Sequence, residues 1–303
     1  MLSNRRRESG TIDRVRRYPR HFFYTGHQMR IRYGFDIELT LFQPTTVITV
    51  MDVHPSRHSD VIEESAFRTS RGVGCEAFID SFGNLTRRVT TDAGPLALRL
   101  EGVINDSGLR DPVDPSADSA SVSDLPGDVL PFLMASRYCE TDLLSNFAWA
   151  QFGSIKGGWA KVQAVCDFVN ERLTFSYPNA RETRTAVQAM EERSGVCRDF
   201  THLAITVCRC LNIPARFCNG YLGDIGVPPD PAPMDFNAWL EVYLAGQWYT
   251  FDARHNEPRI GRILISRGRD ATDVAMITTY GPHRLPRFKV ITEELPDSVT
   301  LAA

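Results

Sequence analysis

The sequence predicts an α+β protein in which a small β-sandwich precedes a domain of helices packed on an antiparallel sheet. Three observations predict this order. Short alternating runs typical of strands fill residues 29–104, and residues 105–128 are rich in proline, serine and acidic side chains. From residue 129 the apolar residues recur at helical spacing, and β-rich runs return after residue 214. Strands followed by helices and a second set of strands indicate two domains.

Composition places the chain among ordinary globular proteins. Its 303 residues are 43% hydrophobic and 23% charged, and a chain of this length can bury a substantial core. It has no run of 18 apolar residues, and its N-terminus lacks the apolar core of a secretory signal. We therefore expect a cytoplasmic protein with no membrane partner. The seven cysteines are odd in number and irregularly spaced, which indicates reduced thiols rather than a disulfide framework.

Charge is distributed unevenly along the chain. Residues 1–32 hold nine arginines against Glu8 and Asp13, a balance of +7 within a net charge of −3. We interpret residues 1–28 as a basic N-terminal extension. The rest of the chain is acidic, which argues against nucleic acid as the main partner.

The first domain is predicted to span residues 29–104. Residues 30–33 and 46–50 alternate between polar and apolar side chains, and residues 76–80 and 85–89 flank a Gly83-Asn84 turn. About eight such strands would form a small β-sandwich. Residues 105–128, with three prolines and six acidic residues, are interpreted as a linker.

The second domain is predicted to span residues 129–303. Its helices are expected at residues 141–152, 158–173, 183–193 and 197–211, and its strands at residues 215–222, 238–244 and 248–252.

Cys197 is the most informative single residue. Gly195 ends one predicted helix and Cys197 opens the next. A thiol at a helix N-terminus lies at the positive end of the helix dipole, which favours the thiolate and lowers the pKa. Taken alone, a cysteine at such a place is either structural or a reactive thiol, and the partners of Cys197 decide between the two.

A predicted hairpin supplies the partners of Cys197. The strands on either side of Ala245-Gly246 pair Leu244 with Gln247. This register puts Asn237 and Asp252 on one face as diagonal neighbours, roughly 7–8 Å apart at the backbone. An acid at position 252 could orient an imidazole at position 237.

Several ordered motifs then resemble one family. They are Gly195-Val-Cys-Arg-Asp-Phe-Thr-His202, Ile213-Pro-Ala-Arg216, Phe236-Asn-Ala-Trp-Leu-Glu-Val-Tyr243, Trp248-Tyr-Thr-Phe-Asp252 and Pro258-Arg-Ile-Gly261. Together they look like the bacterial transglutaminase-like superfamily, over residues from about 29 to 281. The resemblance implies a papain-like core with Cys197 as nucleophile and Asp252 as acid, catalysing acyl transfer through a thioester. It also makes Tyr177, upstream of the nucleophile, a candidate oxyanion donor.

Asn237 stands where the family motif has histidine. An asparagine cannot act as a general base near neutral pH, and the loss of such a base typically costs about 10²- to 10⁴-fold in rate. The substitution is either natural or engineered. His202 and His255 are the other histidines near the motifs, and we interpret both as structural, with His255 the better alternative base.

Two main functions stay open at this point, beside a less favoured adaptor that would bind nucleic acid or a membrane surface through the arginine-rich N-terminus. One is a cysteine amidase, peptidase or amine acyltransferase that acts on a peptide or small amide and is impaired by Asn237. The other is a catalytically inactive homologue that binds a peptide or protein in the cleft. No cofactor is expected, and no metal site, because Cys208 and Cys210 are two residues apart and point roughly 200° from each other on a helix. The oligomeric state is left open.

Overall fold

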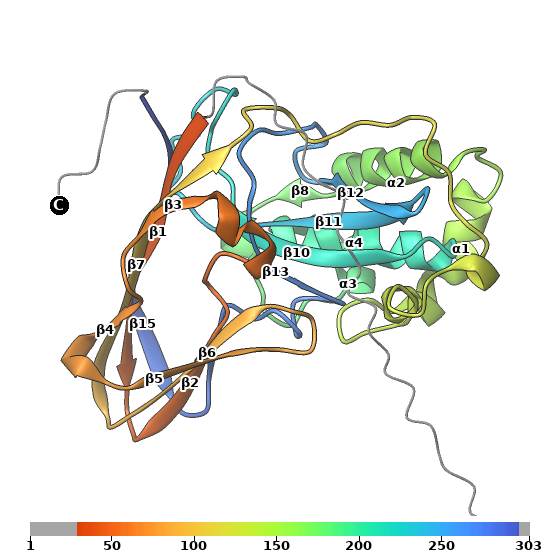
Figure 1. The fold of residues 1–303 in the computed structure, drawn as a ribbon. Coiled ribbons are helices and arrows are strands. Elements are labelled where there is room, and N and C mark those ends of the chain that lie inside the picture. The colour runs from red at the N-terminus through yellow and green to blue at the C-terminus, as the bar shows by residue number, and fades with distance from the viewer. Residues whose placement is uncertain (1–28, 297–303) are drawn as a thin grey trace, which may run out of the picture.

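The computed structural model describes residues 29–296, which form an α+β protein of two adjacent parts (Figure 1). A β-sandwich lies on one side and a helix-covered sheet on the other. The fold class predicted from the sequence is confirmed.

Two antiparallel sheets form the β-sandwich. The first has the order β15-β1-β7-β3, with β4 beside β7, and the second has the order β14-β2-β6-β5. Alternate residues of β1, from Ile31 to Leu41, face the core between the sheets. The strands are β1 (Met29–Leu41), β2 (Thr45–Thr49), β3 (Val61–Glu64), β4 (Arg68–Thr69), β5 (Cys75–Ile79), β6 (Leu85–Thr91), β7 (Gly94–Asp106), β14 (Ile277–Thr279) and β15 (His283–Leu295), with 3-10 turns η1 (Pro55–Asp60) and η2 (Ser70–Gly72).

The last strands of the chain belong to this sandwich and not to the second domain, in which the sequence places residues 129–303. β15 pairs with β1 along its whole length, from Arg30 opposite Leu295 to Leu41 opposite His283, and β14 pairs with β2. Val290 on β15 joins the sandwich core. Burial of that residue against β1 draws the C-terminal strand back across the molecule.

Residues 105–128 are attached to the second domain by specific hydrogen bonds. The carbonyl of Ala117 accepts the N–H of Trp159 at 2.9 Å, and the carbonyl of Asp118 accepts the N–H of Ala245 at 2.8 Å. After β7 the segment, which contains η3 (Val122–Asp124), runs along the helical domain toward α1 (Figure 1). The polar composition of this segment reflects its exposure at the surface, while hydrogen bonds to Trp159 and Ala245 hold its backbone in place.

The second domain is an antiparallel sheet of order β12-β11-β10-β13, covered by helices. α4 is buried on nearly all sides and packs on β10 and β11, with α1, α2 and α3 around it. The elements are η4 (Leu130–Leu133), α1 (Thr141–Phe152), α2 (Gly158–Arg172), β8 (Thr174–Phe175), η5 (Tyr177–Asn179), α3 (Ala186–Glu192), β9 (Ser194–Gly195), α4 (Cys197–Cys210), β10 (Ala215–Tyr221), β11 (Asn237–Leu244), β12 (Gln247–Phe251) and β13 (Ile263–Gly268).

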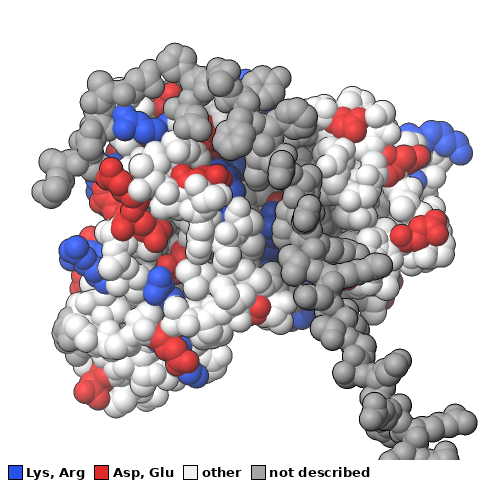
Figure 2. Space-filling view, viewed as in Figure 1, with Lys and Arg blue, Asp and Glu red and all other residues white. Residues whose placement is uncertain are grey.

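The helices match the predicted ranges closely, except that α3 starts three residues late. Thr185 caps it: its hydroxyl accepts the N–H of Gln188, whose side chain in turn accepts the N–H of Thr185. No helix within residues 29–296 is long and apolar enough to cross a membrane. On the face shown in Figure 2, acidic and basic side chains are interspersed over the sandwich.

Candidate active site

Cys197 begins α4, as the sequence predicts, and the preceding backbone is shaped to start a helix. The N–H of Val196 donates to Oδ2 of Asp199 at 2.9 Å. Asp199 is buried and also accepts a hydrogen bond from Arg184 at 3.0 Å. A Cβ on Gly195 would lie 2.6 Å from that of Asp199, so the turn requires glycine there. These contacts fix the first turn, and the thiol lies at the positive end of the helix.

The thiol of Cys197 is surrounded by groups from β11 and from the turn after β12. The backbone N–H of Ala238 hydrogen-bonds to it, and Arg254, Asp235 and Asp252 act on it electrostatically. Burial raises the pKa of Cys197 to about 11, although Arg254 and the N–H of Ala238 lower it. The sequence predicts a lowered pKa for Cys197, but the net shift of the pKa is upward. Loss of hydration on burial raises the pKa by more than the favourable charges lower it.

Asn237 is the first residue of β11 and is 9% exposed. Its Oδ1 accepts a hydrogen bond from Nη1 of Arg254 at 3.1 Å, and its Nδ2 makes long contacts of 3.4 and 3.5 Å to backbone oxygens. The next residue, Ala238, donates to the Cys197 sulfur, so Asn237 sits where the strand meets the thiol. Its amide is committed to Arg254 and offers no proton acceptor for catalysis.

Asp252 is a buried carboxylate with a full set of partners. Its Oδ2 lies 2.9 Å from Nδ1 of His255 and 2.9 Å from Nη2 of Arg262, and its Oδ1 accepts the backbone N–H groups of Arg254 and His255 at 3.0 Å. Burial alone would raise the pKa of Asp252, but Arg262 and the hydrogen bond from His255 hold it well below its usual range. Asp252 is thus an ionised group that orients His255.

The hairpin has the predicted register but ends sooner than expected. Leu244 pairs with Gln247, and the ladder continues to Leu240 opposite Phe251. Ala245 and Gly246 both have positive φ, 46° and 84°, as a two-residue hairpin turn requires. Beyond Phe251 the chain turns instead of continuing as a strand.

This turn changes the partners that the sequence predicts for position 237. The N–H of Asn256 donates to the carbonyl of Asp252 at 2.8 Å, so the backbone folds back within five residues. Asp252 consequently bonds to His255, and Asn237 bonds to Arg254. The sequence predicts Asn237 and Asp252 as diagonal neighbours, and no hydrogen bond joins their side chains among the described residues.

Tyr177, the candidate oxyanion donor, lies in the neighbourhood of the thiol. It is 44% exposed, and its hydroxyl is 3.5 Å from Oδ2 of Asp235. Burial raises the pKa of Tyr177 to about 12, with further contributions from Asp235 and Cys197. The ring of Phe175 packs edge-on against Tyr177 and lies 3.8 Å below the guanidinium of Arg254. The hydroxyl of Tyr177 is therefore loosely held beside the thiol and protonated at neutral pH.

The two other histidines near the motifs have different surroundings. His202 is buried and stacks on Tyr138 at 4.8 Å, and its Nε2 accepts the N–H of Ala271 at 3.1 Å. Burial lowers the pKa of His202 to about 3, so it is a neutral packing residue. His255 is instead partly exposed and bound to the buried acid.

Sequence reasoning missed three charged residues of the site. Asp235, Arg254 and Arg262 each contact or act on a predicted site residue. Asp235 and Arg254 lie two residues outside positions 237 and 252, and the predicted hairpin register, extended past Asp252, brings Arg254 opposite Asn237. The closeness of Asp235 and Arg254 to positions 237 and 252 is the sequence feature that could have identified them as site residues. Burial raises the pKa of Asp235, with the N–H of Phe236 and the hydroxyl of Tyr177 opposing it.

Metal binding finds no support in the part of the chain that the structure covers. Within residues 29–296 no three histidine, cysteine, aspartate or glutamate side chains are arranged to hold an ion. The seven cysteines are free thiols, and Cys208, Cys210 and Cys218 are buried.

Comparisons with known proteins find a family model that matches part of the chain. Residues 146–253, which include Cys197, Asn237 and Asp252, match the family model described as the Transglutaminase-like superfamily. An uncharacterised protein of Mycobacterium leprae is 33% identical over 94 residues, which cover 30% of this chain and 33% of that protein. The match therefore spans about a third of that relative's length.

One solved structure extends the likeness beyond that segment. A proposed cysteine protease from Cytophaga hutchinsonii has a TM-score of 0.78 and 28% identity, with coverage of 91% of this chain and 93% of that one. The periplasmic domain of TgpA from Pseudomonas aeruginosa, bound to ethylmercury, has a TM-score of 0.38 and 15% identity, with coverage of 74% and 90%. The family match over Cys197 and the hairpin identifies residues 146–253 of this chain as a domain of the transglutaminase-like superfamily.

Proposed function

We propose that the chain is a cysteine hydrolase or acyltransferase that acts on peptides or small amides in the cytoplasm through a thioester on Cys197. The observation that supports this most is the placement of the thiol. It lies at the start of α4, against the N–H of Ala238, with a buried ionised Asp252 at the end of the neighbouring hairpin. This combination suits a nucleophile better than a packing residue.

In the proposed reaction the sulfur of Cys197 attacks the carbonyl carbon of an amide. The thiol proton is transferred to an acceptor, and the carbonyl oxygen becomes an oxyanion that the hydroxyl of Tyr177 and the N–H groups at the start of α4 can bind. The C–N bond then breaks and the protonated amine leaves, which gives a thioester. Attack by water or by a second amine breaks the C–S bond and returns the thiol.

The proposed reaction needs a group that accepts the proton of the Cys197 thiol. Asn237 cannot serve, and its amide is held by Arg254. Asp235, whose pKa is raised by burial, acts on Cys197 directly, and His255 is held by Asp252; each is a group that can accept a proton. We propose that the chain reacts slowly for this reason.

One observation favours a second candidate, a catalytically inactive homologue that binds a peptide or protein in the cleft. The pKa of Cys197 is raised to about 11, so few molecules carry a thiolate at neutral pH. A chain selected only for binding has no need of an ionised sulfur.

Acyl-enzyme formation separates the two candidates. The protein is incubated with p-nitrophenyl acetate or a peptide amide, with and without an added primary amine, and adducts are located by mass spectrometry. An enzyme gives an adduct on Cys197 that turns over and disappears in Cys197→Ala, while Cys75→Ala, a change in the remote sandwich, has no effect. Absence of any Cys197 adduct up to pH 9 would favour the binding protein. An amine-dependent product would identify transamidation.

A further inference from the structure

A cavity lies where the sandwich meets the α+β domain. Its volume is about 310 Å³, and it is lined by η1, by the segment after β7, by β11 and β12, and by residues around β13. This volume is at the lower end of the range for small-molecule sites. The charged side chains that line it are Arg57, Asp106, Arg110, Asp111, Glu241, Arg259, Arg262 and Arg267.

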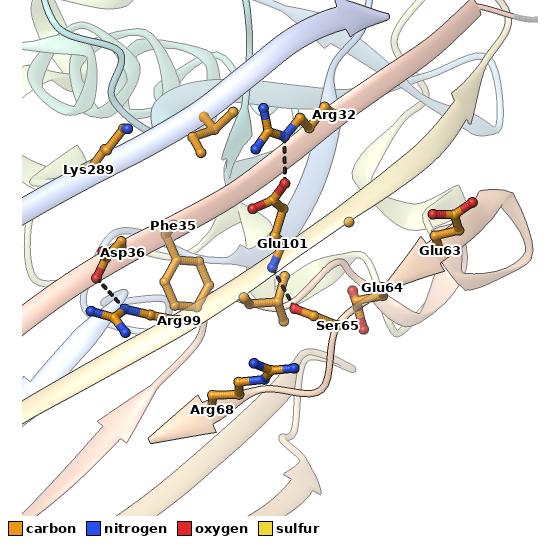
Figure 3. Close-up of a pocket in the computed structure, with 13 residues that line it drawn as sticks. Arg32, Phe35, Asp36, Glu63, Glu64, Ser65, Arg68, Arg99, Glu101 and Lys289 are labelled. Carbon is orange, nitrogen blue, oxygen red and sulfur yellow. Dashed lines mark hydrogen bonds and ion pairs between the residues drawn. The ribbon is translucent and has the colours of Figure 1, made fainter. Parts of the chain in front are cut away.

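The charge of this cavity is unbalanced. Five arginines and three acidic residues line it, and Arg110 and Arg259 are the lining arginines that form no ion pair with a described residue. The larger cavity on the sandwich, of about 610 Å³, shows the opposite case: it is lined by four basic and four acidic side chains (Figure 3). There Arg32 bonds to Glu101 and Asp36 bonds to Arg99, and the basic and acidic side chains are equal in number.

Two arginines of the smaller cavity are buried with part of their hydrogen-bonding capacity unused. Arg259 is 5% exposed and Arg262 is 8% exposed. Arg262 bonds to Asp111 and Asp252, but its Nη1 has no partner among the described residues. Arg259 bonds to the carbonyl of Gly223, its Nε has no partner, and it forms no ion pair within residues 29–296.

Arg262 has two carboxylate partners, whereas Arg259 is a buried cation without one. A buried charge without a counterion loses hydration that nothing replaces, and the guanidinium of Arg262 also repels that of Arg259. Burial lowers the pKa of Arg259, and the neighbouring Arg262 lowers it further. Arg198 and Arg287 also have a buried nitrogen without a partner, but both are more exposed and neither lines this cavity.

We propose that this cavity is a binding site for a small oxyanion, such as the phosphate group of a small ligand. The planar fork of a guanidinium matches two oxygens of such a group, and several arginines around one cavity favour a multiply charged anion. Arg110 is exposed at the rim and bonds only to the carbonyl of Pro258, so it is available to a ligand. The inference is independent of any reaction at Cys197.

The site is linked to the candidate active site through Arg262. This side chain contacts Asp252 through Nη2 and lines the cavity. An anion at Arg262 would compete with Asp252 for its guanidinium. Bound anion should therefore alter the surroundings of His255, the other partner of Asp252.

Phosphate binding tests the proposal. Inorganic phosphate is titrated into the full chain at low ionic strength and followed by calorimetry. We expect saturable 1:1 binding that weakens as salt is added. Arg259→Gln and the exposed Arg110→Gln should each weaken it by at least about tenfold, the equivalent of one charge-assisted hydrogen bond. Arg68→Gln, in the charge-balanced cavity, is the matched control and should leave it unchanged.

Three results would overturn the proposal. They are the absence of saturable binding, binding unaffected by both cavity variants, and an equal loss in Arg68→Gln. If Arg259→Gln does not fold, as judged by circular dichroism, Arg110→Gln decides, because its exposed side chain can be replaced without opening the core.

Discussion

Replacing Asn237 with histidine should convert a slow thiol into a catalytic one. With a pKa of about 11, Cys197 is ionised in only about 1 molecule in 3000 at pH 7.5, whereas an ordinary cysteine of pKa about 8.5 is ionised in about 1 in 10. The surroundings of the sulfur thus cost about 300-fold in thiolate. A base placed beside the thiol removes the proton during attack and makes a preformed thiolate unnecessary.

The expected gain in kcat/KM for Asn237→His is at least about 10²-fold, the low end for a positioned general base. The assay compares an activated ester with a peptide amide, because only the amide requires protonation of its leaving group. Asn237→Gln keeps an amide at this position and is the matched control, which should show no gain. Adding Cys197→Ala to Asn237→His should abolish the activity.

The structure identifies one obstacle to this gain. Asp252, which would have to orient the new imidazole, is already bonded to His255 and Arg262. Adding His255→Gln to Asn237→His should therefore raise the rate further by freeing the carboxylate. If the unchanged protein is already fast, gains nothing from histidine at 237 and loses activity in His255→Gln, then His255 is the base and our reasoning about position 237 is refuted.

Three further predictions concern ionisation and packing. Alkylation of Cys197 by iodoacetamide, followed by peptide mapping, should accelerate about tenfold per pH unit from pH 7 to 10 and slow in Arg254→Gln; a plateau near pH 8 would mean that the thiol is not desolvated. His202 titrates near pH 3 in the folded chain and near 6.5 when unfolded, so its contribution to stability is complete above pH 6.5 and is lost as pH falls. Between pH 7.5 and 5, protonation of His202 in the unfolded chain should lower the free energy of unfolding, measured in urea, by about 2 kcal/mol. The variant His202→Gln should lack that loss, and an equal loss in the variant would contradict this account. Gly220→Ala should destabilise the protein by about 1–3 kcal/mol or more, because its Cβ would lie 2.1 Å from the carbonyl oxygen of Ile263, whereas Gly127→Ala meets nothing within 4 Å and is the control; equal unfolding midpoints for the two variants would argue against the close approach at Gly220.

Local patterns of the sequence carried most of the fold. The start of α4 at Cys197 and the two-residue turn at Ala245-Gly246 follow from capping and turn chemistry, which act over a few residues. The pairing of β15 with β1 joins segments some 250 residues apart, and no local pattern encodes such a pairing.

In the candidate site, too, local features could be predicted from the sequence and features that depend on the whole fold could not. The sequence placed Cys197 at its helix start and the hairpin in its register, because both can be predicted from spacing, but it put Asp252 in a strand that ends one residue earlier. It gave the wrong sign for the thiol pKa, since desolvation depends on atoms brought together by the whole fold. It also missed the short turn after Phe251, which gives His255 to Asp252 and Arg254 to Asn237.

The pairing of β1 with β15 has a consequence for biosynthesis. β1 is made first among the described strands, but the partner on one of its sides is the last strand to leave the ribosome. At about 5–20 residues per second, roughly 13–50 s separate the two. Throughout that interval the nascent chain carries a 13-residue strand with one unpaired edge, which nascent-chain chaperones would have to shield from other chains.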